Sequence, residues 1–523
     1  MNIYSKILGL GLVASLGLNL NGAVYEVPAG VLSTIAGDAS PFTWETGNEY
    51  VLQGVVYVNG GNTLTIQKGV IIRGQPEEYI GPTRQLNPGT LVITRDGWID
   101  AQGTSTQPII FTTAATDNDA NDAWDEIGGG ITAARRWVSG DTFHDNDPLN
   151  APLPLKSGGK TNYELCGGLI VLGNAPNNVD GISGLLLGER YIEGLPENAN
   201  SVYGGVDPND NSGVLKYISV RHTGGFISST NDINGLTLGS VGYGTKIEYI
   251  EAYCTRDDAI EFFGGTVNTR YLAAIYFNDD GFDMDEGFSG LCQFWFALAT
   301  TDAGIGDNGF EWDGDHEFDN APEQAKVNSL RLPRTYPYIM NATFIGGGST
   351  GKNPRAIHTR HNASGAIMNS ILTNCKGPAI RIGEDPGDSS DGDEVPNRTL
   401  ANYNAGLLRF HRNVWWNFKF TGGAFTNTQV GLADSTDEQP VFGADPLNLN
   451  AIVDPLLLSV VAPVNPRPAA AGNVAVTGAA TRAAYTSTFF TPVTYKGAFS
   501  TSTSTRLWTT NWTAAHKVGA LVQ

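Results

Sequence analysis

A short acidic phrase occurs three times between Asp257 and Asp315. It reads DDAIEFFGG from Asp257, DDGFDMDEG from Asp279 and DNGFEWDGD from Asp307, so its copies begin 22 and 28 residues apart. Periods of about 20 to 50 residues are typical of solenoids, in which each unit buries its apolar side only against its neighbours. The chain is therefore expected to form one elongated repeat body.

Short runs of alternating apolar and polar residues recur with the same spacing around these phrases. One series contains LKYISVRH from Leu215, IEYIEAYC from Ile247 and TRYLAAIY from Thr269, and a second series follows it at a nearly constant distance. A period of two residues indicates β-strands. Two series that advance together predict an all-β fold, a right-handed parallel β-helix solenoid of roughly a dozen coils.

The predicted organisation follows from where this repeat starts, breaks and fades. Residues 1–23 are predicted to be a signal peptide, because Lys6 precedes an apolar run and the small residue Ala23 follows it. A signal peptide implies a secreted protein, extracellular or held at the cell surface. The remaining predicted parts are an N-terminal cap strand in 24–50, a β-helix over 51–431 with long surface insertions near 114–162 and 177–213, and a C-terminal cap module over 432–523.

The formal net charge of −21 limits the possible partners. A nucleic acid or an anionic membrane surface would require clustered Lys and Arg, so neither is expected. No segment after the signal peptide has the ~20 continuous apolar residues of a transmembrane helix. The four cysteines lack the spacing of metal ligands and are expected to pack as small apolar residues, although one pair could oxidise in an exported chain: Cys166, Cys254, Cys292 and Cys375.

Stacking the three phrases by their own period aligns their acidic residues in columns. Strands in neighbouring coils lie ~4.8 Å apart, so uncompensated carboxylates would repel one another and raise each other's pKa. Ca²⁺ accepts 6 to 8 oxygen ligands in irregular geometry. We therefore predict at least one Ca²⁺ site, formed by Asp257, Asp258, Glu261, Asp279, Asp280, Asp283 and Asp285 and extended by Asp307, Glu311 and Asp313. The alternative is a solvated acidic ridge, neutralised by water and by Lys246, Arg256 and Arg270.

Basic residues continue the second series beyond the acidic columns, namely Arg355, His358, Arg360, His361 and Arg381. A groove with carboxylates at one end and basic groups at the other would suit a polysaccharide lyase or a glycoside hydrolase. The Gly-His-Gly and Arg-Ile-Lys motifs that accompany Asp-Asp pairs in polygalacturonases are absent from the sequence. A simpler interpretation is that the basic column pairs with the acidic one, and no catalytic residue is assigned.

Four Asn-x-Ser/Thr sequons are candidate glycosylation sites. Two of them, at Asn362 and Asn397, fall in turn-like polar segments and are the preferred acceptors of the four. Asn341 falls in a predicted strand and would need an outward side chain, and Asn511 lies near the end of the sequence.

Several motifs are similar to those of a known class of proteins. They are LTIQKGVIIRG, WIDAQGTSTQPIIFTT, GLIVLGNAP, DDAIEFFGGTVN, YKGAF and TTNWT. On these motifs the chain resembles secreted bacterial right-handed parallel β-helix repeat proteins of unassigned biochemistry. The resemblance covers most of the chain after the signal peptide, and it implies export and a β-helix but no reaction.

The expected function is therefore structural. The sequence favours a non-enzymatic, exported structural or adhesive β-helix protein of the cell surface or extracellular matrix, stabilised by Ca²⁺ and able to associate end to end into fibres. The alternatives are a carbohydrate-active enzyme and a non-catalytic glycan-binding protein.

Overall fold

The computed structural model describes residues 22–522 apart from 81–82, 86, 117–123, 128–130, 158, 180–183, 227–232, 315–330, 384–397, 422–423, 426–430, 433–448, 470–472, 474–475 and 477–486. Most of the predicted signal peptide (residues 1–23) and the sequon at Asn397 lie outside these ranges. Within them, no helix is long and apolar enough to cross a bilayer.

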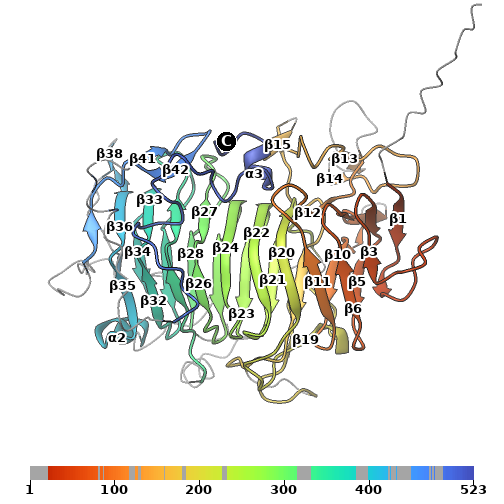
Figure 1. Ribbon diagram of the computed structural model, residues 1–523, viewed down its shortest axis with the longest axis horizontal. Coiled ribbons are helices and arrows are strands. Elements are labelled where there is room, and N and C mark those ends of the chain that lie inside the picture. The colour runs from red at the N-terminus through yellow and green to blue at the C-terminus, as the bar shows by residue number, and fades with distance from the viewer. Residues whose placement is uncertain are drawn as a thin grey trace, which may run out of the picture.

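The chain winds into an elongated parallel β-helix, as the repeats predict (Figure 1). One wall is an eleven-stranded parallel sheet, called sheet B below, to which successive coils contribute one strand each. Its ten strand spacings of ~4.8 Å give a wall about 48 Å long. In order along the wall, the strands are β2 (Gly30–Val31), β5 (Val55–Val58), β10 (Thr90–Ile93), β17 (Leu169–Leu172), β21 (Leu236–Gly239), β23 (Ile260–Phe263), β25 (Phe282–Asp285), β28 (Phe310–Asp313), β31 (Ile357–Arg360), β34 (Ile380–Ile382) and β39 (Gly431–Leu432).

The remaining walls form a 19-stranded sheet, called sheet A below, because its longest strands continue around a corner of the coil. Its strands are β1 (Val24–Val27), β3 (Thr43–Trp44), β4 (Glu49–Leu52), β6 (Thr63–Ile66), β7 (Ile71–Gly74), β11 (Trp98–Gln102), β12 (Ile109–Thr113), β20 (Gly213–Arg221), β22 (Lys246–Thr255), β24 (Thr269–Phe277), β26 (Leu291–Gln293), β27 (Phe296–Leu298), β29 (Tyr338–Met340), β30 (Thr343–Ile345), β32 (Gly365–Met368), β33 (Ile371–Cys375), β35 (Leu408–His411), β36 (Val414–Phe418) and β40 (Ala451–Ile452). The β-helix thus reaches β40, beyond the predicted boundary at residue 431.

The corner of sheet A carries a column of stacked rings, called the aromatic ladder below: Tyr217, Tyr249, Tyr271 and Phe294. Each has a positive φ, between 50° and 59°, which turns the strand and makes its ring point outward. A positive φ is unfavourable for such bulky residues. The ring centroids lie 4.3, 4.4 and 4.9 Å apart in successive pairs, and this stacking offsets part of the backbone cost.

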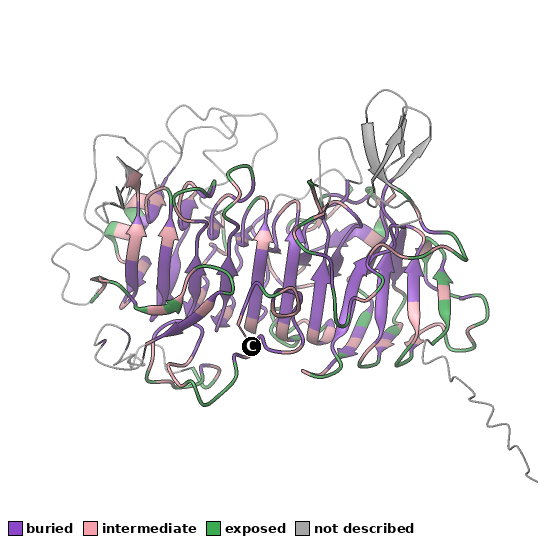
Figure 2. Ribbon diagram, turned by 90° about the horizontal axis from the view of Figure 1, so that it is seen from above, coloured by how far each residue is buried: buried purple, intermediate pink, exposed green. Residues whose placement is uncertain are grey.

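Inward side chains of all walls form a continuous core along the axis. Figure 2 shows that most residues of the stacked strands are buried. Phe282 illustrates the packing, because its ring lies 4.4 Å from Trp295 of the same coil and 5.5 Å from Phe310 of the next. Burying an aromatic side chain of this size contributes about 1.5 to 3 kcal/mol. All four cysteines are free and buried, as expected of residues that pack as small apolar groups.

The last described residues, 487–522, form a segment called the C-terminal strap below. It belongs to the region for which the sequence predicts a C-terminal cap module, and it lies along the side of the β-helix (Figure 1). Gln293 exchanges two hydrogen bonds of 2.8 Å with the backbone of Thr491, and the Ala498 amide donates to Thr343 Oγ1 at 2.8 Å. The strap therefore bridges several coils of sheet A.

Beneath the strap, sheet A is apolar on its outer side. Tyr253, Ile275, Phe296 and Ile345 are buried there against strap residues such as Phe499. The strap ends in the short helix α3 (Ala514–Lys517), whose first two amides donate to the buried carboxylate of Glu251 at 2.6 and 3.0 Å. Without the strap this apolar surface would face water.

The predicted insertions leave the coil as small hairpins. The first contains β13 (Trp124–Ile127) with β14 (Ile131–Ala134) and β15 (Lys156–Ser157) with β16 (Lys160–Thr161), and the second contains β18 (Arg190–Tyr191) with β19 (Val202–Tyr203). The other elements are β8 (Glu78–Ile80) with β9 (Thr83–Gln85), β37 (Phe420–Thr421) with β38 (Ala424–Phe425), β41 (Leu457–Ser459) with β42 (Asn465–Pro468), the 3-10 helix η1 (Ala199–Ser201) and helix α2 (Arg398–Asn404).

Candidate metal and ligand site

The acidic phrases form three neighbouring strands in the middle of sheet B, namely β23, β25 and β28. Because side chains alternate along a strand, Phe262, Met284 and Trp312 point into the core while the carboxylates between them point outward. Glu261 pairs in register with Asp283, and Phe263 with Asp285. The predicted alignment of acidic residues in columns is therefore present in the structure.

A second column, just before these strands, has a structural function. The Asp258 amide donates to Asn234 Oδ1 at 3.2 Å, the Asp280 amide donates to Asp258 Oδ1 at 2.7 Å, and the Asn308 amide donates to Asp280 Oδ1. Each side chain thus satisfies the backbone of the following coil. This explains why Asp or Asn recurs at the second position of the phrase, whether or not a ligand binds.

A cavity of about 210 Å³ opens over the outward carboxylates. Ten carboxyl groups line it, together with one guanidinium group, that of Arg360. Ligand oxygens of Asp258, Glu261 and Asp283 lie within 4.8 Å of one another, and so do those of Asp257, Asp258 and Asp279. Oxygens at these separations can share one cation with Ca–O distances of about 2.3 to 2.6 Å.

Burial and mutual repulsion both act on the carboxyls of this cavity. Burial, followed by the charges of neighbouring acidic groups, raises the pKa of Asp258, Glu261, Asp280, Asp283 and Asp285 well above the usual range. One oxygen of Asp283, Oδ1, has no hydrogen-bond partner among the residues that the structure describes. The cavity can lower this repulsion by taking up either protons or a cation.

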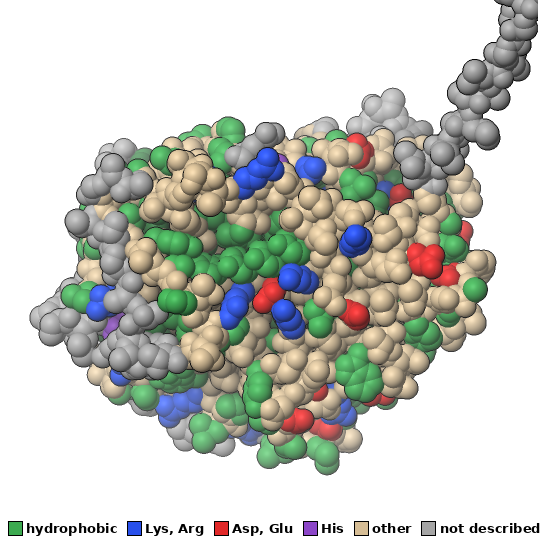
Figure 3. Space-filling view, viewed as in Figure 1, with side chains coloured by type: hydrophobic (Ala, Val, Ile, Leu, Met, Phe, Trp, Pro, Cys, Tyr) green, Lys and Arg blue, Asp and Glu red, His purple; other side chains and the backbone are tan. Residues whose placement is uncertain are grey.

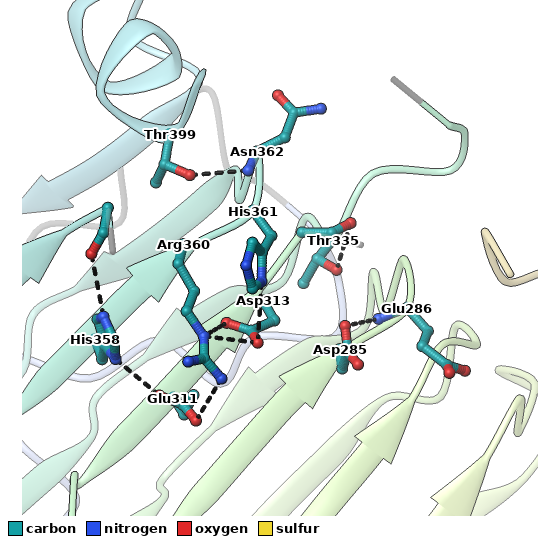
Figure 4. A network of polar contacts seen from close by, with 12 residues as sticks. Asp285, Glu286, Glu311, Asp313, Thr335, His358, Arg360, His361, Asn362 and Thr399 are labelled. Carbon is teal, nitrogen blue, oxygen red and sulfur yellow. Dashed lines mark hydrogen bonds and ion pairs between the residues drawn. The ribbon is translucent and has the colours of Figure 1, made fainter. Parts of the chain in front are cut away.

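The basic end of the cavity is internally paired (Figure 4). Arg360 Nε lies 2.8 and 2.9 Å from the two carboxylate oxygens of Asp313, and His358 Nδ1 lies 2.9 Å from Glu311 Oε1. Burial alone would raise the pKa of both carboxyls, but the charge of Arg360 and the contacts with His358 and His361 lower it. The interpretation that the basic column pairs with the acidic one is confirmed.

The structure shows which of the ten predicted Ca²⁺ ligands line the acidic cavity. Nine of the ten line the cavity, whereas Asp307 does not and lies 3.8 Å from Lys352 Nζ. Sequence reasoning missed Glu193, which comes from the second insertion, and Asn234. Asn234 could have been found, because NGLTLG aligns with the acidic phrase, but no pattern in the sequence indicated Glu193.

The sequons lie in less accessible positions than expected. Asn341 is buried, and its Nδ2 donates to the Tyr495 carbonyl at 2.9 Å. Asn362 lies in a turn, as predicted, but its side chain is also buried and accepts a hydrogen bond from Asn402. Asn511 is half-buried.

Comparison with known protein families yields a match that covers most of the chain. A family model described as a pectate-lyase like beta helix domain matches residues 37–135 and 150–435, a range that contains the whole acidic cavity. No curated protein and no solved structure matches the chain.

Proposed function

The chain belongs to the family of pectate-lyase-like β-helix domains, and from this membership we propose that it is an exported protein that binds a polysaccharide through Ca²⁺ held in the acidic cavity. The observation that carries the proposal is the convergence of Asp258, Glu261 and Asp283, whose ligand oxygens lie within 4.8 Å of one another. Pectate, which the family description names, is an acidic polysaccharide, and this supports a carbohydrate as the partner.

A divalent cation fits the chemistry of these side chains. Ten carboxyl groups face one cavity with a single guanidinium group, and that guanidinium already pairs with Asp313 and Glu311. Hard oxygen ligands of this kind select Ca²⁺ over softer metals. Asp258, Glu261 and Asp283 would hold the ion, which would supply positive charge and further coordination positions for oxygen atoms.

The cation also determines which glycan can bind. Without it, the cavity would repel a polymer of acidic sugars, since both carry negative charge. With it, carboxylate or hydroxyl oxygens of the polymer can complete the 6 to 8 ligands that Ca²⁺ accepts. Binding without turnover is consistent with an adhesive or structural β-helix at a cell surface.

We expect Ca²⁺-dependent retention of acidic polysaccharides. Affinity electrophoresis through polygalacturonate or alginate, with 1 mM Ca²⁺ or with EDTA, measures it. Retention should require Ca²⁺ and should fall at least tenfold for Asp283→Asn, whereas Glu26→Gln, an exposed substitution on β1, should leave it unchanged. Equal retention with EDTA would contradict the proposal.

A hydrolase is the second candidate, and one observation favours it. Asp283 has a raised pKa and neighbouring Glu311 a lowered one within a single cavity, so one can hold a proton while the other is ionised. Incubation of the protein with the same polysaccharides, followed by an assay for new reducing ends, decides between binding and hydrolysis. The proposal predicts none, and release that disappears in Asp283→Asn would establish an enzyme instead.

Self-association forms a further part of the proposal, because the N-terminal end of the β-helix has open strand edges. Strand β1 pairs with β4 and β2 pairs with β5, and no described strand pairs with their other edges. Val24 and Val31 are 43% and 48% exposed there. Such edges can pair with another chain.

We expect concentration-dependent oligomers in sedimentation velocity and short filaments by electron microscopy, both reduced by Val24→Lys. Dispersed monomers at millimolar Ca²⁺ and high protein concentration would contradict end-to-end association.

A further inference from the structure

A second cavity, of about 180 Å³, lies where the C-terminal strap crosses the aromatic ladder. Tyr271 of the ladder and Tyr495, Phe499 and Trp508 of the strap contribute to its walls. The Trp508 ring stacks on Phe499 at 5.4 Å and meets Tyr271 edge-on at 5.6 Å, while its Nε1 donates to the Ala498 carbonyl at 3.0 Å. These contacts fix the aromatic walls in place.

Arg467 brings a buried positive charge to this cavity. Its side chain is 6% exposed, and its guanidinium donates to the Thr505 carbonyl. In the part of the chain that the structure describes, it forms no salt bridge, and neither does the exposed Arg506 that also lines the cavity. A desolvated cation is costly without an opposite charge, so this position favours an anion.

The surrounding surface carries more positive charge than negative. Figure 3 shows Lys and Arg side chains grouped around an acidic one beside a hydrophobic area on this face. Glu248 lies 3.7 Å from Lys216 Nζ and 3.5 Å from Lys246 Nζ, and it pairs in register with Arg270, the residue before Tyr271. Two lysines therefore share one carboxylate, and Arg270 adds a third positive charge on the neighbouring strand, in a protein whose net charge is −21. An anion would be attracted to this face and repelled by most others.

We propose that the strap cavity binds one anionic sugar unit, a pyranose ring that carries a carboxylate or a sulfate group. The guanidinium groups of Arg467 and Arg506 offer forked donors to such a group. The edge of the Tyr271 ring, whose faces stack on Tyr249 and Phe294, and the ring of Trp508 offer apolar contact to the C–H groups of the sugar. The hydroxyls of Tyr271 and Tyr495 can bond to its oxygens.

The size of the cavity supports a single unit. A volume of about 180 Å³, equal to that of roughly six waters at ~30 Å³ each, is enough for one sugar ring. The strap cavity lies against sheet A, whereas the acidic cavity lies on sheet B, so the two sites are independent.

Calorimetric titration of the full chain tests the strap cavity, and EDTA in the buffer keeps calcium binding out of the measurement. The probes are glucuronate, glucose 6-sulfate, glucose and sodium sulfate. We expect at least one anionic sugar to bind with 1:1 stoichiometry and at least tenfold more tightly than glucose or sulfate alone, and comparison of the two anionic sugars identifies the preferred group. Arg467→Gln should weaken binding at least tenfold and Arg506→Gln at least threefold, while Lys68→Gln, an exposed charge-matched control, should not change it.

Thermal melting identifies any variant that fails to fold. If Arg467→Gln does not fold, the affinity of the Arg506→Gln variant, whose substitution is at an exposed position, tests the proposal. Equal affinity for glucose, sulfate binding as tight as that of the sugars (an adventitious ion only), or unchanged affinity in folded arginine variants would each overturn the proposal. Because EDTA is present throughout, failure of the sugars to bind would say nothing against calcium-dependent binding in the acidic cavity. Failure of the calcium-dependent retention would equally say nothing against the strap cavity.

Discussion

Addition of 1 mM Ca²⁺ to chelator-treated protein should raise its melting temperature by several degrees. At a ligand concentration 100-fold above the dissociation constant, binding to the folded state alone adds about 2.7 kcal/mol to the free energy of unfolding. The cause is the replacement of carboxylate repulsion among Asp258, Glu261 and Asp283 by coordination. Differential scanning calorimetry with and without EDTA measures the shift.

The rise in melting temperature that Ca²⁺ causes should become larger as the pH rises from 5 to 8. These carboxyls have a folded-state pKa above the unfolded value, so protonation stabilises the metal-free fold at low pH, and that contribution is lost as pH rises through the folded pKa. Burial, followed by the charges of Asp307 and Glu311, raises the pKa of Asp279 at the cavity mouth to about 6, which places part of the loss inside this window. Calcium binding replaces the missing protons.

Asp283→Asn separates a metal site from a solvated acidic ridge. The substitution removes one ligand and one repelling charge, so the metal-free variant should melt higher than the metal-free wild type and gain less from Ca²⁺. Glu26→Gln, remote from the cavity, should behave as the wild type. A calcium shift of equal size in Asp283→Asn, or no shift in the wild type, would rule out this site.

The second large effect is expected at Glu251. Its buried carboxylate accepts hydrogen bonds from the Ser219 hydroxyl at 2.5 Å and from the first two amides of helix α3. Glu251→Ala leaves these donors without their acceptor and the nearby buried Arg221 without its opposite charge, which should cost about 3 to 5 kcal/mol. Denaturant unfolding measures the loss, and hydrogen exchange over residues 507–521 should rise with it.

Glu248→Ala is the matched control, because Glu248 lies on the same strand β22 but is partly exposed and pairs only with surface lysines. It should cost less than about 1 kcal/mol. If Glu251→Ala costs no more than this control, or leaves exchange in the strap unchanged, the strap is held by its apolar contacts and its other hydrogen bonds, and not by Glu251.

The sequence predicted the β-helix because its period sets the register of every coil. Glu261 and Asp283 lie side by side for that reason, and no tertiary information was needed to align them. The separate function of Asp258 and Asp280 was not predictable, since a carboxylate that accepts a backbone amide and one that faces a cavity look alike in sequence. Glu193 was missed because the path of an insertion is not fixed by any period.

The contacts of the strap were not predictable for a related reason. Tyr217, Tyr249 and Tyr271 fall within runs that the sequence predicts as regular strands, although each occupies a corner with positive φ, where its ring is available to a distant segment. Contacts such as that of Trp508 with Tyr271 join residues more than 200 positions apart. Nothing in a local pattern encodes them.

The position of the strap in the chain has a consequence for biogenesis. Every coil that it covers precedes it, so a growing or translocating chain completes β22, β24, β27 and β30 before the segment that shields their outer apolar side exists. During that interval a nascent molecule exposes this apolar surface to other nascent molecules, with which it can aggregate. Efficient production of this protein therefore depends on keeping newly emerged chains apart until the strap has docked.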